Sequence, residues 1–175
     1  ELLDACDSRQ PSLVGLANYT WNERLNAFAG KRLRELFPNL PIVMGGPNIA
    51  TEEKGIEEFL KKYNFVDVYC MYGGELAFSR IIESQLEKPL KEDWLKFLFS
   101  DPEFCGYSIC DGKLIGSGSF TVDKNLDFIP SPYLTGILDS FLEKGFIPIM
   151  ETNRGCPFAC TFCVWGISAL SKIQV

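Results

Sequence analysis

Short apolar runs alternate with helical patterns along the first ninety residues of this chain. Runs at 12–17, 41–44 and 65–70 have the length and apolar content of buried strands, and apolar residues at helical spacing follow each run. Strands that alternate with helices are typical of a parallel sheet covered by helices. Residues 1–90 are therefore predicted to form an α/β domain with a parallel sheet.

The first predicted helix lies between the strands at 12–17 and 41–44. Thr20 and Glu23 form the Thr-x-x-Glu pattern of a capping box, which places the helix start beside them. Pro38 is expected to end the helix. Its apolar residues recur at helical spacing and are expected to face the core; they are Leu25, Phe28, Ala29, Leu33 and Leu36.

A turn follows each predicted strand, at 18–22, 45–48 and 72–75. The carboxyl ends of parallel strands lie at one edge of a sheet, and ligands bind beyond that edge in such folds. Glycine pairs at 45–46 and 73–74 allow a ligand to approach the backbone, and helix N-termini present N–H groups to it. The first pair is equally consistent with a tight strand-to-helix turn that binds nothing.

Residues 91–145 are predicted to connect this sheet to a second domain. An amphipathic helix is expected within 87–104, and Asp111-Gly112 between short apolar runs predicts a β-hairpin. The proline-rich stretch 126–133 is expected to be an extended linker.

Residues 146–175 are predicted to begin that second domain. A short helix at 136–142 precedes it, and its first strand is expected at 146–152. The cysteine-rich loop that follows would lie at the carboxyl end of this strand, where barrel enzymes place catalytic groups.

Three cysteines are the strongest chemical signal in the chain: Cys156, Cys160 and Cys163. Their spacing is C-x3-C-x2-C, so three thiolates on one short loop can hold three irons of a cubane. Most [4Fe–4S] electron carriers use four cysteines. A site with three leaves one iron open for a substrate or cofactor, as catalytic metal sites do.

Other roles for these cysteines stay open on the residues alone. Structural zinc normally has four ligands, and the chain has no histidine. A disulfide framework is typical of an even cysteine count in a small secreted chain, whereas this chain has seven cysteines. Buried free thiols are common. An electron-transfer cluster would need a fourth ligand, for which Cys105 and Cys110 are candidates, although both are expected to be buried thiols near the hairpin.

The segment Arg-Gly-Cys-Pro-Phe-Ala-Cys-Thr-Phe-Cys resembles the cluster loop of the radical S-adenosylmethionine (SAM) enzymes. The resemblance implies a [4Fe–4S] cluster held by Cys156, Cys160 and Cys163, with Phe162 beside the adenine of SAM. In that family the open iron binds SAM, whose reductive cleavage gives a 5′-deoxyadenosyl radical that takes hydrogen from the substrate. Arg154 either adds positive charge near the cluster or holds the loop by bonding main-chain carbonyls, and the second role is expected.

The order of the turns resembles the cobalamin-binding domain that precedes many radical SAM domains. Tyr-Thr-Trp-Asn follows the first strand, Val-Met-Gly-Gly-Pro spans the end of the second, and Gly-Gly-Glu follows the third. The resemblance covers residues 10–90 and implies a Rossmann-like domain with the nucleotide tail of cobalamin against these turns. The implied contacts are Tyr19, Gly45, Gly46, Pro47, Gly73 and Gly74.

Three features depart from that family pattern. Ala17 stands where the family often has serine, and Tyr-Gly-Gly-Glu at 72–75 replaces the usual Gly-Glu-Gly-Glu. The histidine that can ligate cobalt is absent, as is any histidine. That ligand would come from the turn after a strand expected to precede residue 1, and many relatives lack it.

Charge and composition narrow the function classes. The net charge of −6 and the isoelectric point near 4.8 argue against a general affinity for nucleic acid or anionic membranes. No apolar run approaches the roughly 20 residues that span a bilayer, and the N-terminus lacks the features of a signal peptide. Unpaired cysteines indicate a reducing cytoplasm. Basic groups at 31–34 and 61–62 are expected to be solvated helix faces.

The sequence thus predicts the front part of a cobalamin-binding radical SAM enzyme. It would comprise an incomplete Rossmann-like domain at 1–90, an interdomain region at 91–145 and the start of a partial TIM barrel at 146–175. The chain lacks an initiator methionine and most of that barrel. The 175-residue chain alone is therefore expected to be inactive.

The expected reaction is methyl transfer from methylcobalamin to an unactivated carbon of a small-molecule or natural-product-type substrate. A reducing partner such as flavodoxin or ferredoxin would supply the electron, and no catalytic residue is assigned. One alternative is radical rearrangement, cyclisation or oxidation without cobalamin chemistry. Another is a non-catalytic protein that binds cobalamin or a partner and has a structural metal site.

Overall fold

The computed structural model describes residues 8, 11–71, 74–87, 91–117, 126–127, 129–151, 154–158 and 160–163. The chain divides into two compact units, Glu1–Phe120 and Thr121–Val175. The first unit extends past residue 90 because the predicted hairpin joins its sheet. The functional identity of each domain stays a prediction.

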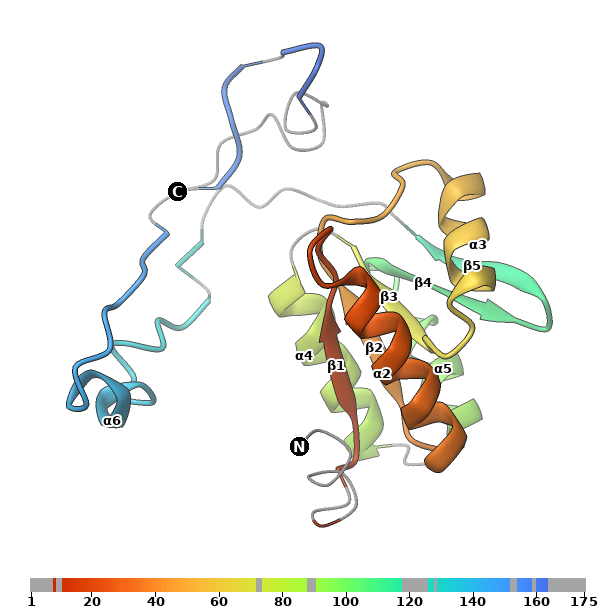
Figure 1. Ribbon diagram of the computed structural model, residues 1–175, viewed down its shortest axis with the longest axis horizontal. Coiled ribbons are helices and arrows are strands. Elements are labelled where there is room, and N and C mark those ends of the chain that lie inside the picture. Colours follow the sequence, from red (N-terminus) through yellow and green to blue (C-terminus); the bar gives the residue numbers. More distant parts are fainter. Residues whose placement is uncertain are drawn as a thin grey trace. The chain divides into compact units, whose positions relative to one another are not determined.

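The first unit contains a five-stranded sheet in the order β1-β2-β3-β4-β5 (Figure 1). Strand β1 pairs with β2 in parallel, and β2 pairs with β3 in parallel. Strand β4 is antiparallel to both of its neighbours, β3 and β5. The strands are β1 Val14–Ala17, β2 Ile42–Gly45, β3 Val68–Cys70, β4 Gly106–Cys110 and β5 Lys113–Ser117. The predicted parallel sheet of three strands is confirmed, and its Rossmann-like α/β class with it.

Helices cover both faces of this sheet. In Figure 1, α2 lies in front of the strands, and the fainter α4 and α5 lie behind them. The helices of this unit are α2 Glu23–Leu36, α3 Glu53–Lys62, α4 Gly74–Glu87 and α5 Lys91–Leu98. One hydrophobic cluster joins α2 and α3 to the sheet, and a second joins α4 and α5 to its other face.

Alternate residues of β2 supply these two clusters. Ile42 and Met44 belong to the cluster with α2 and α3, whereas Val43 belongs to the cluster with α4 and α5. All three are almost fully buried. A strand covered on both faces is a continuous apolar run, which explains why the sequence revealed it.

The buried face of α2 differs from the predicted one. Leu25 is 67% exposed and Phe28 is 71% exposed, while Asn26, Gly30 and Leu33 are buried. A Cβ on Gly30 would lie 2.1 Å from the ring of Phe65. The missing side chain therefore lets the helix approach the sheet along the Gly30–Leu33 stripe, and the prediction for Leu25 and Phe28 was wrong.

The predicted capping box is also not formed. Helix α2 begins at Glu23, so Glu23 occupies the first helical position rather than the third, and Asn22 is the N-cap. The side chain of Asn22 accepts a hydrogen bond from the Tyr19 N–H (2.8 Å) and donates one to the Ala17 carbonyl (2.8 Å). The Glu23 carboxylate is thereby available for contacts outside its own helix.

The predicted hairpin is confirmed and extends the sheet. Asp111 and Gly112 have φ values of 49° and 74°, as expected of a two-residue hairpin turn. Strand β4 pairs with β3 through Tyr69 and Tyr107. The preceding helix is shorter than expected, because α5 ends at Leu98.

The second unit contains the short helix α6, Asp139–Leu142. The strand expected at 146–152 is not formed: its described residues, 146–151, belong to neither helix nor strand. This segment instead contacts Tyr133, whose hydroxyl donates to the Ile149 carbonyl (2.8 Å) and accepts from the Ile149 N–H (3.1 Å). A parallel strand needs a neighbouring strand, and none pairs with 146–151 in the part of the chain described.

Candidate functional site

The turns after β1 and β2 meet at the carboxyl edge of the sheet, as predicted. The Asn18 N–H donates to the Gly45 carbonyl (2.6 Å), and the Asn48 N–H donates to the Asn18 carbonyl (3.3 Å). The Asn18 side-chain amide adds a 2.7 Å bond to the Asn48 carbonyl. These bonds make one connected surface of the two turns.

The buried side chain of Tyr69, a residue of β3, contacts the same edge from the interior of the domain. Its hydroxyl donates to the Gly46 carbonyl (2.7 Å) and accepts a hydrogen bond from the Asn18 side chain (3.1 Å). Tyr69 and Asn18 are both almost fully buried. Burial raises the pKa of Tyr69 to about 12, so this hydroxyl remains a proton donor at neutral pH.

The Gly45-Gly46-Pro47 turn is the most exposed part of this edge. Gly46 and Pro47 are exposed, and Gly45 is partly exposed. Gly46 has a φ of 126°, and a Cβ there would lie 2.4 Å from the Asn18 carbonyl oxygen. Glycine is therefore required at position 46 by the fold, in agreement with the tight-turn interpretation.

Tyr19 lies in the turn after β1. Its ring stacks on Trp21 with a centroid distance of 4.5 Å and an interplanar angle of 12°. Trp21 is 79% exposed. This turn therefore presents a flat aromatic surface to solvent.

The third predicted turn is described only from Gly74 onward, because Gly73 lies outside the described residues. Gly74 begins α4, and a Cβ added to it would meet no atom within 4 Å among the described residues. The backbone there is open to a ligand. The exposed Gly46, the partly exposed Gly45 and Gly74, and the start of α4 fit the backbone contacts implied for cobalamin.

Glu23 forms a second polar cluster beside the edge that the sequence did not reveal. Its carboxylate accepts hydrogen bonds from the Tyr63 hydroxyl and from the Asn48 side chain (3.2 Å), and Lys62 lies 3.7 Å away. Hydrogen bonds from Tyr63 and then Asn48 lower the pKa of Glu23. Its carboxylate thus links α2, α3 and the turn after β2.

The cysteine loop lies in the second unit. Cys156, Cys160 and Cys163 are free thiols; Cys160 is exposed and the other two are partly exposed. The Cys163 N–H donates to the Cys160 carbonyl (3.1 Å), which makes a tight turn at the end of the motif. Phe162, the residue implied to lie beside adenine, is 91% exposed.

The structure does not bring the three thiols together. Within the described ranges, no three Cys, Asp or Glu side chains are close enough to hold a metal ion. The donor set itself fits a cluster, because three free and accessible thiols lie on one loop. Arg154 pairs with Glu151 at 2.9 Å, a contact that lies within the loop.

The cysteines outside the motif divide into two kinds. Burial raises the pKa of Cys105 to about 11 and that of Cys70 to about 12, so both thiols stay protonated at neutral pH. Cys110 is exposed, contrary to the expectation that it is buried. Cys6 lies outside the described residues.

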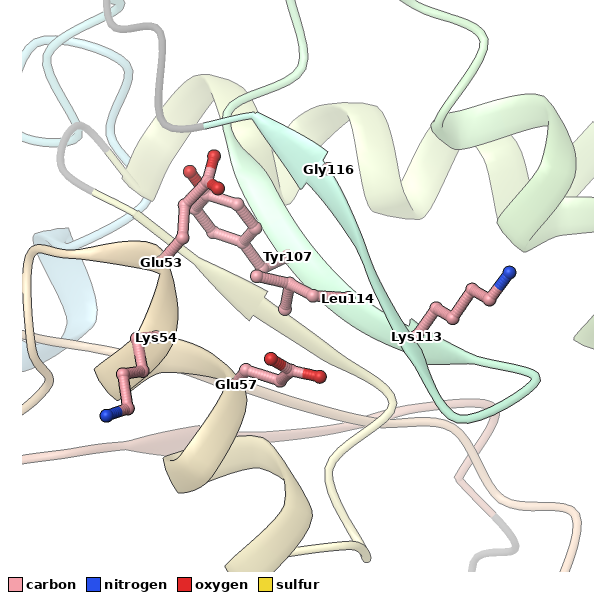
Figure 2. A pocket seen from close by; sticks show the side chains of 7 residues that line it. All are labelled: Glu53, Lys54, Glu57, Tyr107, Lys113, Leu114 and Gly116. Carbon is pink, nitrogen blue, oxygen red and sulfur yellow. The ribbon is translucent and has the colours of Figure 1, made fainter.

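A cavity of about 390 Å³ lies between α3 and the β4–β5 hairpin. Figure 2 shows the Glu53 and Glu57 side chains pointing toward Tyr107 and Leu114 of the hairpin, whereas Lys54 points away from it. Its lining residues include none of the site residues predicted from the sequence.

None of the helices in the described part of the chain is long and apolar enough to cross a membrane.

A Rossmann-like sheet with open turns at its carboxyl edge, followed along the chain by a three-cysteine loop, is the arrangement expected of a cobalamin-binding radical SAM protein. Comparison of the sequence with known proteins also finds relatives in the class of cobalamin-dependent radical SAM proteins. The chain is 30% identical over 176 residues to the cobalamin-dependent radical SAM methyltransferase TokK from Streptomyces tokunonensis. That alignment covers 94% of the chain and 24% of TokK.

Two further relatives are methyltransferases. One is a 2-(S-pantetheinyl)-carbapenam-3-carboxylate methyltransferase from Streptantibioticus cattleyicolor, 27% identical over 176 residues, which cover 94% of the chain and 24% of that protein. The other is an uncharacterized methyltransferase from Pyrococcus horikoshii, 25% identical over 157 residues, which cover 87% of the chain and 31% of that protein. No family model matches the sequence.

These relatives confirm the resemblance inferred from the cysteine loop and the turns. The similarity to TokK extends over nearly the whole chain, including both units. The chain spans about a quarter of the length of the first two relatives.

Proposed function

We propose that this chain is part of a radical SAM enzyme that transfers a methyl group from methylcobalamin to an unactivated carbon. The observation that carries the proposal is the C-x3-C-x2-C loop of free thiols that follows a Rossmann-like sheet along the chain. The relative TokK, which is named a cobalamin-dependent radical SAM methyltransferase, aligns with 94% of this chain and supports the proposal. The protein is expected to act in the cytoplasm, where such a cluster is protected from oxidation.

Cys156, Cys160 and Cys163 would bind a [4Fe–4S] cluster as thiolates, and Phe162 would contact the adenine of SAM. When bound, these groups supply the 5′-deoxyadenosyl radical, and cobalamin supplies the methyl group. The exposed Cys160, the partly exposed Cys156 and Cys163, and the exposed Phe162 ring support these roles, because each is accessible in the structure. Arg154 would stabilise the loop through Glu151.

Cobalamin would bind at the carboxyl edge of the sheet. Tyr19, Gly45, Gly46, Pro47, Gly73 and Gly74 are the proposed contacts. The exposed turn at 45–47 and the open backbone at Gly74 support this placement. The nucleotide tail is the part of the ligand that would pack against these turns.

The substrate is proposed to be a small molecule of the natural-product type. The name of one relative specifies a carbapenam carboxylate as the molecule it methylates, which supports this class. A flavodoxin or ferredoxin would reduce the cluster. The 175-residue chain alone is proposed not to catalyse turnover, because it covers so small a part of its active relatives.

The test of this proposal is cluster assembly in the full-length protein. After anaerobic incubation with iron and sulfide, we expect about four irons and four sulfides per chain, as in a cubane. Cys160→Ala should lose most of both. Cys110→Ala is the matched control, because Cys110 is an exposed free thiol outside the motif, and it should assemble the cluster normally.

Two results would favour other functions. A protein that binds a single metal ion without sulfide would support a structural metal site. Loss of the cluster in a variant with both Cys105 and Cys110 changed to alanine would support an electron-transfer site with a fourth ligand. Cys105 is a poor ligand because burial keeps its thiol protonated.

A further inference from the structure

Tyr69 makes a contact that the sheet itself does not require. It lies within β3, and its hydroxyl crosses to the turn after β2, where it donates to the Gly46 carbonyl at 2.7 Å. The same oxygen accepts a hydrogen bond from the Asn18 side chain at 3.1 Å. One buried hydroxyl thus connects all three parallel strands at their carboxyl ends.

This contact fixes the direction of a peptide group on the protein surface. Gly46 is exposed, yet its carbonyl oxygen points inward to the buried Tyr69 hydroxyl. The φ of 126° at Gly46 is a conformation that glycine alone adopts without strain. A flexible glycine turn needs such an anchor if it is to keep one conformation, because its backbone has many alternatives.

We propose that Tyr69, supported by Asn18, is a positioning residue that holds the Gly45-Gly46-Pro47 turn in the conformation that receives the nucleotide tail of cobalamin. The inference rests on the proposed cobalamin function of this edge. Neither side chain contacts the ligand, because both are buried beneath the turn. Tyr69 would act on binding through the Gly46 carbonyl, and Asn18 would act through Tyr69 and the Asn48 carbonyl.

A different buried hydroxyl provides a matched control. Ser108 of β4 is 2% exposed, and its hydroxyl donates to the Asp67 carbonyl at 2.6 Å. The chemistry is the same as that of Tyr69 and Gly46: a buried hydroxyl bonds a main-chain carbonyl. Asp67 precedes β3, however, so this bond lies at the amino end of the strand and away from the turns.

The experiment measures equilibrium binding of hydroxocobalamin and of cobinamide, which lacks the nucleotide tail, to the full-length protein. Tyr69→Phe removes only the hydroxyl, and with it the bonds to Gly46 and from Asn18. It should raise the dissociation constant for hydroxocobalamin about five- to tenfold, because the turn loses the hydrogen bond that holds its Gly46 carbonyl. Its affinity for cobinamide should change less than twofold. Ser108→Ala should leave both affinities unchanged. Hydrogen exchange in the peptide containing residues 45–48 should be faster in Tyr69→Phe and normal in Ser108→Ala.

Asn18→Ala is measured in parallel, so that the inference stays testable if Tyr69→Phe does not fold. It leaves the Tyr69 hydroxyl in place but removes the amide that donates to it and to the Asn48 carbonyl. The same selective loss of hydroxocobalamin affinity is expected. Unchanged hydroxocobalamin affinity in the folded variants would overturn the inference while the proposed function stands. An equal loss of affinity for both ligands would also overturn it. A wild-type protein that retains no hydroxocobalamin would instead overturn the proposed cobalamin function, and this inference with it.

Discussion

Arg34 extends from the last turn of α2 and holds together the amino end of the sheet. Its guanidinium group donates hydrogen bonds to the carbonyls of Pro38 (2.6 Å), Leu40 (3.0 Å) and Phe65 (2.9 Å). It also pairs with Asp67 at 2.6 Å. The Asp67 side chain is only 5% exposed. Arg34 is therefore not part of the solvated face that the basic cluster at 31–34 predicted.

Replacement of Arg34 tests this anchor. Arg34→Met should lower the free energy of unfolding by about 3 kcal/mol, because it removes the guanidinium group that pairs with the buried Asp67 carboxylate. Arg32→Met is the control: Arg32 pairs with Glu35 on the surface, where both side chains are about half exposed or more. That change should cost less than about 1 kcal/mol.

Urea unfolding of both variants gives the comparison. Equal losses for Arg34→Met and Arg32→Met would show that the Asp67 carboxylate does not depend on Arg34 in solution. The measurement also separates fold from function, because Arg34 lies at the opposite end of the sheet from the candidate site.

Helix α2 shows how the packing of one element departs from its periodicity. Leu25, Phe28 and Leu36 recur at helical spacing, yet they are 67%, 71% and 45% exposed. The helix packs instead through Gly30 and Leu33, because glycine permits the close approach of Phe65. A hydrophobic stripe alone could not reveal this, since periodicity does not record where two backbones come close.

The two stripes of α2 should respond differently to substitution. Leu33 is fully buried, so Leu33→Ala should lower the free energy of unfolding by about 2–5 kcal/mol. Leu25→Gln should change it by less than about 0.5 kcal/mol, because the side chain is exposed and glutamine is a good helix former. Thermal or urea unfolding of the full-length protein measures both. A large cost for Leu25→Gln would show that another part of the protein covers this stripe.

Local patterns predicted most of the elements well. The three parallel strands and their helices were found within a few residues, because a sheet covered on both faces leaves apolar runs in the sequence. The hairpin was found from Asp111-Gly112, whose turn requires positive φ. The pairing of the hairpin with β3 was not predicted, because β3 and β4 pair through residues that are far apart in the sequence. The strand expected at 146–152 was wrong, since no partner strand lies beside its described residues.

At the scale of the whole molecule, the sequence predicted where the candidate site lies, but it did not predict the side chains that hold the turns of the site in place. Parallel strands share an edge, so the turns at 18–22 and 45–48 were expected to meet, and they do. Tyr69 and Glu23 were missed because their partners lie far away in the chain, at Asn18 and Tyr63. A tyrosine within an otherwise apolar buried strand was the available signal, because its hydroxyl needs a partner.

For the cysteine loop, the sequence predicted the chemistry of the site, whereas the structure does not show its assembled geometry. Its spacing predicted the chemistry, and the relatives over 94% of the chain support the same class. The structure shows accessible thiols on a turn but does not assemble them around a metal, as far as the described residues go. A cluster draws its ligands together only when it is bound, because metal binding and ordering of the site are coupled.

The most direct test of this account is electron paramagnetic resonance of the reduced, anaerobically reconstituted full-length protein, recorded with and without SAM. The account predicts a cubane signal that changes when SAM is added, because SAM occupies the iron that the three cysteines leave open, and it predicts no such signal in Cys160→Ala. A cubane signal that is identical with and without SAM would contradict the open iron, and with it the assignment of this protein to radical SAM chemistry.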